Sequence, residues 1–169
     1  VIWKYDCSNR GINTPPLVVD GSVYCGHREQ NSSDTRILGA IFAINGDKAT
    51  GEIKEDELKW KIAGRSVEGS QPLLVDGRLY AIEDGGTLVV INPENGEIIQ
   101  TKKIGRRPGS LVYGDGKIYC CEQTGNFWVF EPTEEGVKEI SHVRMKSGEE
   151  LLAAPIISHG KIYVTSTKA

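Results

Sequence analysis

The chain has 169 residues, of which 25% are charged and 38% hydrophobic, with 20 glycines and a net charge of −3. This is the composition of a globular domain, and the small negative charge excludes a general attraction to nucleic acid. No apolar run reaches the roughly 18 residues that a membrane-spanning helix needs, so we expect no membrane span.

The first predicted elements are a strand over 1–5, a loop over 7–14 and a hairpin over 16–24 that turns at Asp20-Gly21. An Asp-Gly pair between two β-rich runs favours a type I′ turn, because that turn needs positive φ at both central residues. The hairpin, with its closing tyrosine, recurs as PLVVDGSVY (16–24), PLLVDGRLY (72–80), SLVYGDGKIY (110–119) and PIISHGKIY (155–163). The turn glycines are spaced by 56, 39 and 44 residues. A period near 40 residues is typical of a β-propeller blade.

The second copy shows a whole blade. After the first turn, within the hairpin, a second turn at 84–86 leads to a strand over 87–91, and a third turn at 92–96 leads to a strand over 98–102. The first copy adds a polar insert over 27–36 and a long turn over 45–57. No helix of useful length is expected, although the polar segments 134–139 and 147–150 could each form a short helical turn.

We therefore predict one all-β domain over 1–169, a partial β-propeller of about three complete four-stranded blades plus flanking strands. The predicted units are blades at 15–63, 70–104 and 109–144, an incomplete blade at 153–169, and a strand at 1–6 that ends a preceding blade. The first and last strands would be open edges, which proteins usually cover. We expect further blades of the same protein, or another chain, to complete the ring.

The repeats resemble those of the PQQ-like (pyrroloquinoline-quinone-like) propeller family, and the resemblance covers nearly the whole chain. PLLVDGRLYAIEDGGTLVVINPENGEIIQ (72–100) matches the family blade except at Gln100, where the family carries a docking tryptophan. Trp60 keeps that residue in the first blade, and Ile140 replaces it in the third. The family contains BamB-like binding scaffolds, uncharacterised bacterial propellers and quinoprotein dehydrogenases that hold PQQ and calcium. The resemblance also implies a periplasmic or secreted location.

The cysteines bear on the choice between scaffold and dehydrogenase. Cys120 and Cys121 are adjacent, and the family's alcohol dehydrogenases resemble this in carrying a disulfide between adjacent cysteines against the cofactor. Here, however, the pair follows Tyr119 within a predicted strand, where neighbouring side chains point to opposite faces. We interpret the two as packed strand residues. With no nucleophile elbow, phosphate loop or metal-ligand spacing either, we predict no catalytic, cofactor or metal site.

Basic residues gather in the loops that we expect on one face of the propeller. If the strands of each blade alternate in direction, the between-blade loops and the second turn of each blade share a face with the insert. The candidate partner-binding residues on this face are Arg10, His27, Arg28, Arg65, Arg106 and Arg107. The chemistry fits an acidic protein or peptide segment, and a glycan is a further candidate; the alternative is ordinary solvated loop charge.

The sequence thus favours a non-catalytic, extracytoplasmic scaffold for protein interaction or ligand binding. The alternative is a fragment of a PQQ-dependent dehydrogenase, and only in that case would PQQ and calcium be needed.

Overall fold

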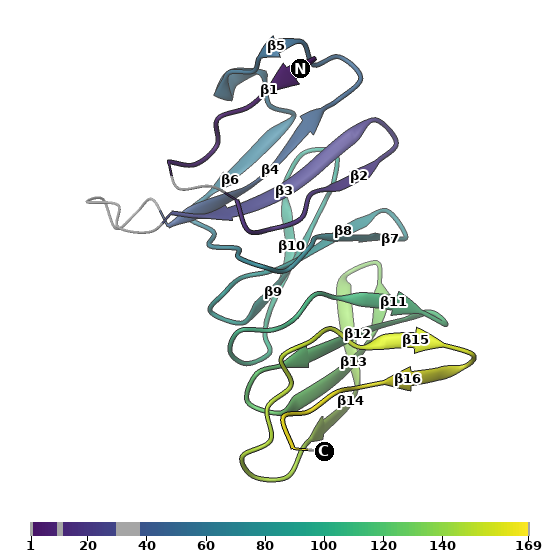
Figure 1. Ribbon diagram of the computed structural model, residues 1–169. Coiled ribbons are helices and arrows are strands. Elements are labelled where there is room, and N and C mark those ends of the chain that lie inside the picture. The colour runs from purple at the N-terminus through teal and green to yellow at the C-terminus, as the bar shows by residue number, and fades with distance from the viewer. Residues whose placement is uncertain (1, 10–11, 30–37, 169) are drawn as a thin grey trace.

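The computed structural model describes residues 2–9, 12–29 and 38–168, and strands dominate it (Figure 1). The first sheet contains β2 (Leu17–Val19), β3 (Ser22–Arg28), β4 (Gly39–Asn45) and β6 (Trp60–Ala63). The second contains β7 (Leu73–Val75), β8 (Arg78–Ile82), β9 (Thr87–Ile91) and β10 (Ile98–Lys103). The third contains β11 (Val112–Gly114), β12 (Lys117–Glu122), β13 (Asn126–Thr133) and β14 (Gly136–Arg144). A two-stranded sheet, β15 (Ile156–Ser158) and β16 (Lys161–Tyr163), follows.

Each four-stranded sheet is an antiparallel meander, because each strand is hydrogen-bonded to the next strand of the same sheet. The sheets succeed one another in chain order like the blades of a fan (Figure 1). We call them blades 1, 2 and 3, and we call β15–β16 the half-blade. This arrangement confirms the predicted fold class, an all-β partial propeller, and the described chain does not close a ring.

The four recurring hairpins turn through left-handed backbone at both central residues. The non-glycine members Asp20, Asp76, Asp115 and His159 have φ between 46° and 49°, and each following glycine has φ of 69°. Aspartate and histidine adopt this region more readily than most side chains, and glycine does so without strain. The local sequence therefore specifies the hairpins, including the one in which histidine replaces aspartate.

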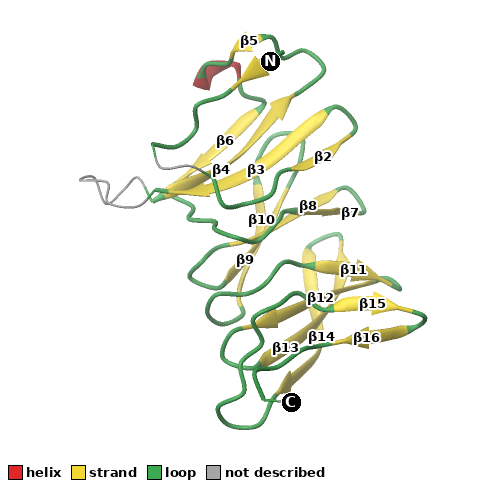
Figure 2. Cartoon of the chain, viewed as in Figure 1, coloured by secondary structure: helices red, strands yellow, loops and turns green. Residues whose placement is uncertain are grey.

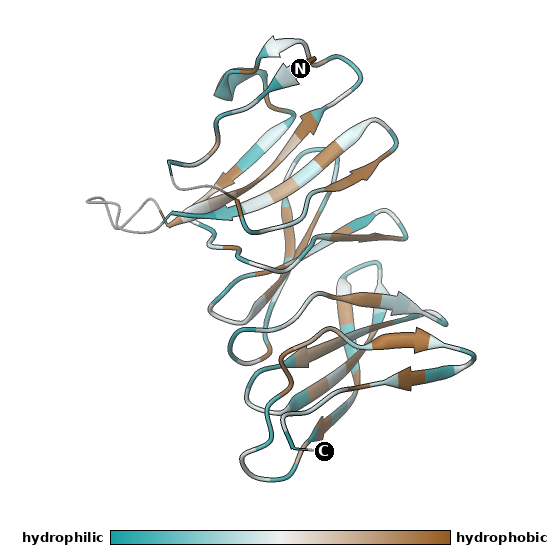
Figure 3. Ribbon diagram, in the orientation of Figure 1, coloured by the Kyte–Doolittle hydropathy of each residue, from teal (hydrophilic) through white to brown (hydrophobic). Residues whose placement is uncertain are grey.

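The hydrophobic core lies between neighbouring blades. Leu79, Ala81, Val89 and Ile91 of blade 2 pack toward blade 1, in a cluster with Tyr24, Ile41 and Trp60. The alternate residues Tyr80, Ile82, Leu88 and Val90 pack toward blade 3, with Ile118 and Phe130. Because successive strand residues point to opposite faces, a sheet buried on both faces needs an unbroken apolar run. That requirement explains the apolar character of the two inner strands of blade 2, β8 and β9 (Figure 3).

Two local features differ from the sequence prediction. The N-terminal β1 (Trp3–Lys4) pairs in parallel with β5 (Gly51–Glu52), a short strand inside the long turn of blade 1 that the sequence did not reveal. Residues 136–139, expected in a helical turn, belong to β14, because their backbone pairs with Pro132, Thr133 and their neighbours across the hairpin.

Helix is scarce in the described ranges. A single 3₁₀ turn, η1 (Glu55–Glu57), is present there (Figure 2). Among these residues there is no helix of the length and apolarity required for crossing a membrane.

Candidate functional site

A groove of about 1160 Å³ crosses the loops at one end of the three blades. Its lining comes from the end of β3, the turns between the second and third strands of blades 2 and 3, and the linkers between blades. The lining residues are Arg28, Glu29, Leu38, Ser66, Glu68, Asp84, Gly85, Arg106, Arg107, Gln123, Thr124 and Glu150. An adjoining hollow of about 360 Å³ shares Arg28, Asp84 and Arg107 with it. The groove therefore joins segments far apart in the sequence.

Arg28 is neutralised within the groove. Its Nη1 lies 3.1 Å from Glu68 Oε2 and 3.7 Å from Asp84 Oδ2. Glu68 also accepts a hydrogen bond of 2.9 Å from Asn13 Nδ2. The guanidinium charge of Arg28 is thus largely matched by carboxylates of the same protein.

Asp84 and Arg65 have internal partners as well. Ser66 Oγ donates to Asp84 Oδ2 at 2.6 Å, and the Arg65 guanidinium pairs with Glu83 at 3.1 Å. Burial raises the pKa of Asp84 above its usual value, while the hydrogen bond from Ser66 and the charge of Arg28 oppose the shift. These contacts stiffen the linker between blades 1 and 2 and leave little free charge there.

Arg106 and Arg107 differ from the other basic residues. Both are exposed on the groove, and neither guanidinium forms an ion pair or hydrogen bond with another residue of the described chain. Arg107 has a φ of 44°. Its backbone N–H donates to the Asp84 carbonyl at 3.4 Å, which ties this linker to the turn of blade 2. The two adjacent cations therefore lie on the groove with no anionic partner among the residues that the structure describes.

Glu122 lies beneath this pair and is fully buried, with 0% of its surface exposed. Its Oε1 accepts hydrogen bonds from the backbone N–H of Arg106 at 2.8 Å and of Thr124 at 2.9 Å. Its Oε2 accepts from Thr124 Oγ1 at 2.6 Å and from Asn126 Nδ2. Burial alone would raise the pKa of Glu122, but these four hydrogen bonds together hold it below its usual value. Glu122 thus stays ionised and joins a between-blade linker to the turn of blade 3.

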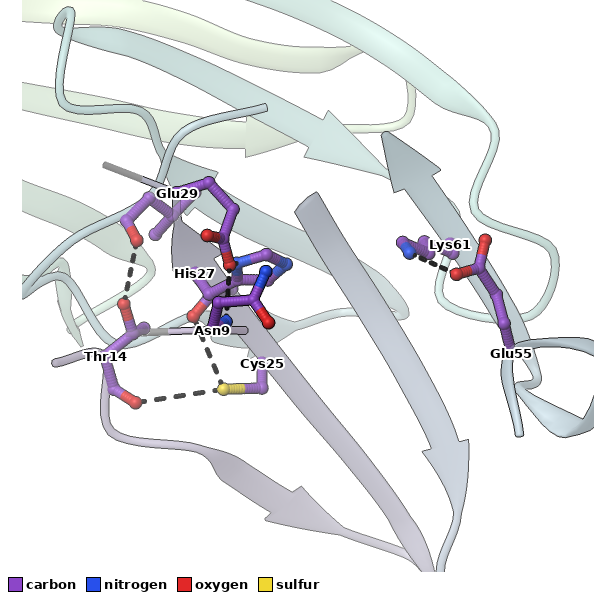
Figure 4. A network of polar contacts seen from close by, with 9 residues as sticks. Asn9, Thr14, Cys25, His27, Glu29, Glu55 and Lys61 are labelled. Atoms are coloured by element: carbon purple, nitrogen blue, oxygen red, sulfur yellow. Dashed lines mark hydrogen bonds and ion pairs between the residues drawn. The ribbon is translucent and has the colours of Figure 1, made fainter. Parts of the chain in front are cut away.

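The structure separates the six predicted partner-binding residues. Arg28, Arg106 and Arg107 line the groove, and Arg65 lies beside it in its ion pair with Glu83. His27 is only 4% exposed, and its Nδ1 lies 3.6 Å from Glu29 Oε1 beneath the surface (Figure 4). Burial lowers the pKa of His27, so the ring is neutral at pH 7. Arg10 lies outside the described residues.

The predicted groups that could carry other chemistry do not face the groove. Cys120 and Cys121 are both buried in β12 and carry free thiols, and Cys120 belongs to the core between blades 2 and 3. Burial raises the pKa of both thiols, that of Cys121 to about 11. Among the described residues, no cluster of three histidine, cysteine or acidic side chains could hold a metal ion. The predictions of no cofactor and no metal remain predictions.

Sequence reasoning missed the acidic residues of the site. Glu83 and Glu122 stand three positions after the repeat tyrosines Tyr80 and Tyr119, and His27 stands three after Tyr24. This recurring polar residue at the end of an apolar strand is a signal that could have marked the linker contacts. The partners of Glu68 and Asp84 lie up to 56 residues away in sequence, so no local pattern reveals them.

Comparison with known proteins finds a matching sequence family and solved structures of similar architecture. The sequence model of a family described as outer membrane protein assembly factor BamB matches residues 1–169. BamB from Moraxella catarrhalis superposes with a TM-score of 0.67 at 13% identity, over 92% of this chain and 44% of that one. No protein with curated annotation matches the sequence.

Two further solved structures share the fold. The computationally designed Ika8 protein has a TM-score of 0.66 at 11% identity, over 96% of this chain and 45% of its own. Sqt1 from Chaetomium thermophilum has a TM-score of 0.68 at 14% identity, over 95% of this chain and 42% of its own. The chain thus spans less than half the length of each of these three structures.

Proposed function

We propose that this chain, which belongs to the PQQ-like propeller family of the outer membrane protein assembly factor BamB, is a non-catalytic scaffold that binds an acidic segment of a protein partner. The observation that carries the proposal is that the Arg106 and Arg107 guanidiniums, on a groove built from three blades, pair with no other described residue. The groove's other described charges sit within contacts inside the protein, so these two cations are available to a ligand.

The shape and charge of the groove suit an extended peptide. A cleft of about 1160 Å³ is slightly larger than most small-molecule pockets, which measure roughly 300–1,000 Å³. Guanidinium groups bind carboxylates with directional, charge-assisted hydrogen bonds. Glu68 and Asp84, which also line the groove, are satisfied by Arg28, Asn13 and Ser66, and therefore repel an incoming carboxylate less than free acids would.

Three wider elements of the proposal rest on the family. The whole protein acts outside the cytoplasm, in the periplasm or after secretion. Further blades of the same protein, or another chain, complete the ring. Binding requires neither PQQ nor calcium, and the dehydrogenase alternative gains no support from Cys120 and Cys121, which are buried away from the groove.

The test uses the whole chain and a fluorescein-labelled hexaglutamate peptide as the probe, with binding read by fluorescence anisotropy. We expect binding that weakens with added salt, and no binding of a hexalysine peptide. The double variant Arg106→Glu/Arg107→Glu should weaken the affinity roughly tenfold or more, since two attractive contacts become repulsive.

The matched control is Lys48→Glu/Lys161→Glu. It changes the net charge equally, but on exposed lysines beside turns that lie away from the groove. An equal loss of affinity in this control, or an unchanged affinity in the arginine variant, would overturn the proposal. Competition by a sulfated glycan but not by hexaglutamate would reassign the groove to a glycan.

A further inference from the structure

Glu83 and Glu122 occupy the same position in successive blades. Each stands three residues after its repeat tyrosine, and each is followed by a turn whose glycine N–H bonds its main-chain carbonyl, at 2.7 Å from Gly86 and 2.9 Å from Gly125. Each also faces the linker through which the chain enters its blade. The two carboxylates nevertheless have different partners.

In blade 2 the Glu83 carboxylate forms an ion pair with a side chain, that of Arg65. Glu83 Oε1 lies 3.1 Å from Arg65 Nη1, and the pair is partly buried, with 16% of the Glu83 side chain and 28% of the Arg65 side chain exposed. The positive charge of Arg65 in this linker is therefore neutralised by Glu83.

In blade 3 the Glu122 carboxylate accepts hydrogen bonds from the main chain and from neutral side chains. Glu122 accepts two backbone N–H groups, the Thr124 hydroxyl and the Asn126 amide, and it contacts no cation among the described residues. Gly105 makes this approach possible, because a Cβ atom there would lie 2.4 Å from Glu122 Cγ. In blade 2 the residue that follows Asp84 is Gly85, which has no hydroxyl to offer in place of that of Thr124.

We propose that Glu122 is the positioning residue of the groove. It fixes the Gly105–Arg107 linker by its main chain and so leaves the guanidiniums of Arg106 and Arg107 free for an anionic ligand. This inference rests on the proposed function, since it explains why those two arginines, rather than Arg65, are available for binding.

Two matched substitutions separate positioning from simple charge. Glu122→Gln and Glu83→Gln each remove one negative charge close to the groove, so long-range electrostatics alone predicts that both bind hexaglutamate more tightly. We expect opposite effects. Glu83→Gln releases Arg65 and strengthens binding, whereas Glu122→Gln loosens the linker and weakens binding, each by roughly two- to five-fold.

A second pair of variants keeps the charge of Glu122 in place. Thr124→Ala and Asn126→Ala each remove one donor to its carboxylate, and both should weaken hexaglutamate binding. These two variants also test the positioning role of Glu122 if Glu122→Gln fails to fold. Circular dichroism and the thermal unfolding midpoint identify the folded variants.

The outcomes distinguish the two claims. If Arg106→Glu/Arg107→Glu weakens binding while Glu122→Gln strengthens it or leaves it unchanged, the positioning role of Glu122 is wrong. The proposal that the groove binds an acidic segment is then still supported. If the arginine variant has no effect, the proposed function fails, and the role of Glu122 fails with it. Weakening by the arginine variant, by Glu122→Gln and by Asn126→Ala, with strengthening by Glu83→Gln, supports both.

Discussion

The indole Nε1 of Trp60 donates a hydrogen bond of 2.8 Å to the main-chain oxygen of Pro93, across the boundary between blades 1 and 2. The ring also covers Gly96, where a Cβ atom would come within 2.9 Å of Trp60 Cδ2. The last strand of one blade is thereby fastened to the third turn of the next. Glycine at this turn is what lets an aromatic ring approach the backbone so closely.

Gln100 makes the equivalent contact between blades 2 and 3. Its Oε1 accepts a hydrogen bond of 2.9 Å from the Val137 N–H, and its Nε2 lies 3.4 Å from the Val137 oxygen. Gly136 again offers the space, because a Cβ atom there would lie 2.5 Å from Gln100 Oε1. A polar side chain thus replaces the family tryptophan with two hydrogen bonds to the same turn.

The first prediction concerns Trp60. Trp60→Ala should lower the free energy of unfolding by about 3–5 kcal/mol, because a large ring is lost from a close-packed interface. Trp60→Phe should cost less, since it keeps an aromatic ring and loses only the hydrogen bond and part of the buried ring surface. Urea denaturation followed by circular dichroism measures both. Ile140→Ala is the control, because Ile140 stands at the same blade position but is 46% exposed, and it should change stability by less than about 0.5 kcal/mol.

The second prediction concerns Gln100. Gln100→Ala leaves the buried Val137 N–H without a partner and should cost about 1–3 kcal/mol in the same measurement. Gln100→Glu keeps an acceptor for that N–H and should cost less at neutral pH. If the two variants are equally stable, the hydrogen bond to Val137 does not contribute to the free energy of unfolding.

The third prediction is a pH dependence of stability. The pKa of Glu122 is lower in the folded protein than its ordinary value of about 4.3 in the unfolded chain. The ionised form is therefore favoured by folding, and its contribution is fully present above the unfolded pKa and lost as the pH falls through the folded pKa. The stability difference between the wild type and Glu122→Gln should be constant from pH 6 to 7 and shrink in acid, roughly below pH 4. A constant difference down to pH 2 would contradict the assignment.

The fourth prediction concerns the thiols. Burial raises the pKa of Cys25 and of Cys121 to about 11 and also raises that of Cys120, so none forms much thiolate at pH 8. Titration with a chromogenic disulfide should find these three unreactive in the native protein and half-buried Cys7 the first to react. All four should react after unfolding. Two missing thiols in the unfolded, unreduced protein, assigned by peptide mass spectrometry to Cys120 and Cys121 rather than to Cys7 and Cys25, would instead revive the dehydrogenase alternative.

Much of the fold was predictable because it depends on short-range geometry. Each Asp-Gly or His-Gly pair turns the chain by its own backbone preferences, and the tyrosine and apolar residues that follow define the next strand. The burial of those tyrosines depends instead on whether a neighbouring blade packs against them. Tyr80 is fully buried between two blades, whereas Tyr163 is 50% exposed in the half-blade, although both close the same sequence repeat.

The candidate site was only partly predictable. The residue types of its loops and the alternation of strands indicated which arginines share a face, and Arg28, Arg106 and Arg107 do line one groove. The sequence by itself thus determined the meander, its repeat and the basic character of the between-blade loops, since each follows from neighbours in the chain. Only the tertiary structure decided that Arg28 and Arg65 are neutralised, that His27 is buried and that Glu122 holds the linker of Arg106. The energy of an ion pair or a buried carboxylate depends on partners that folding brings together, and those partners are up to 56 residues apart in the cases of Arg28 and Asp84.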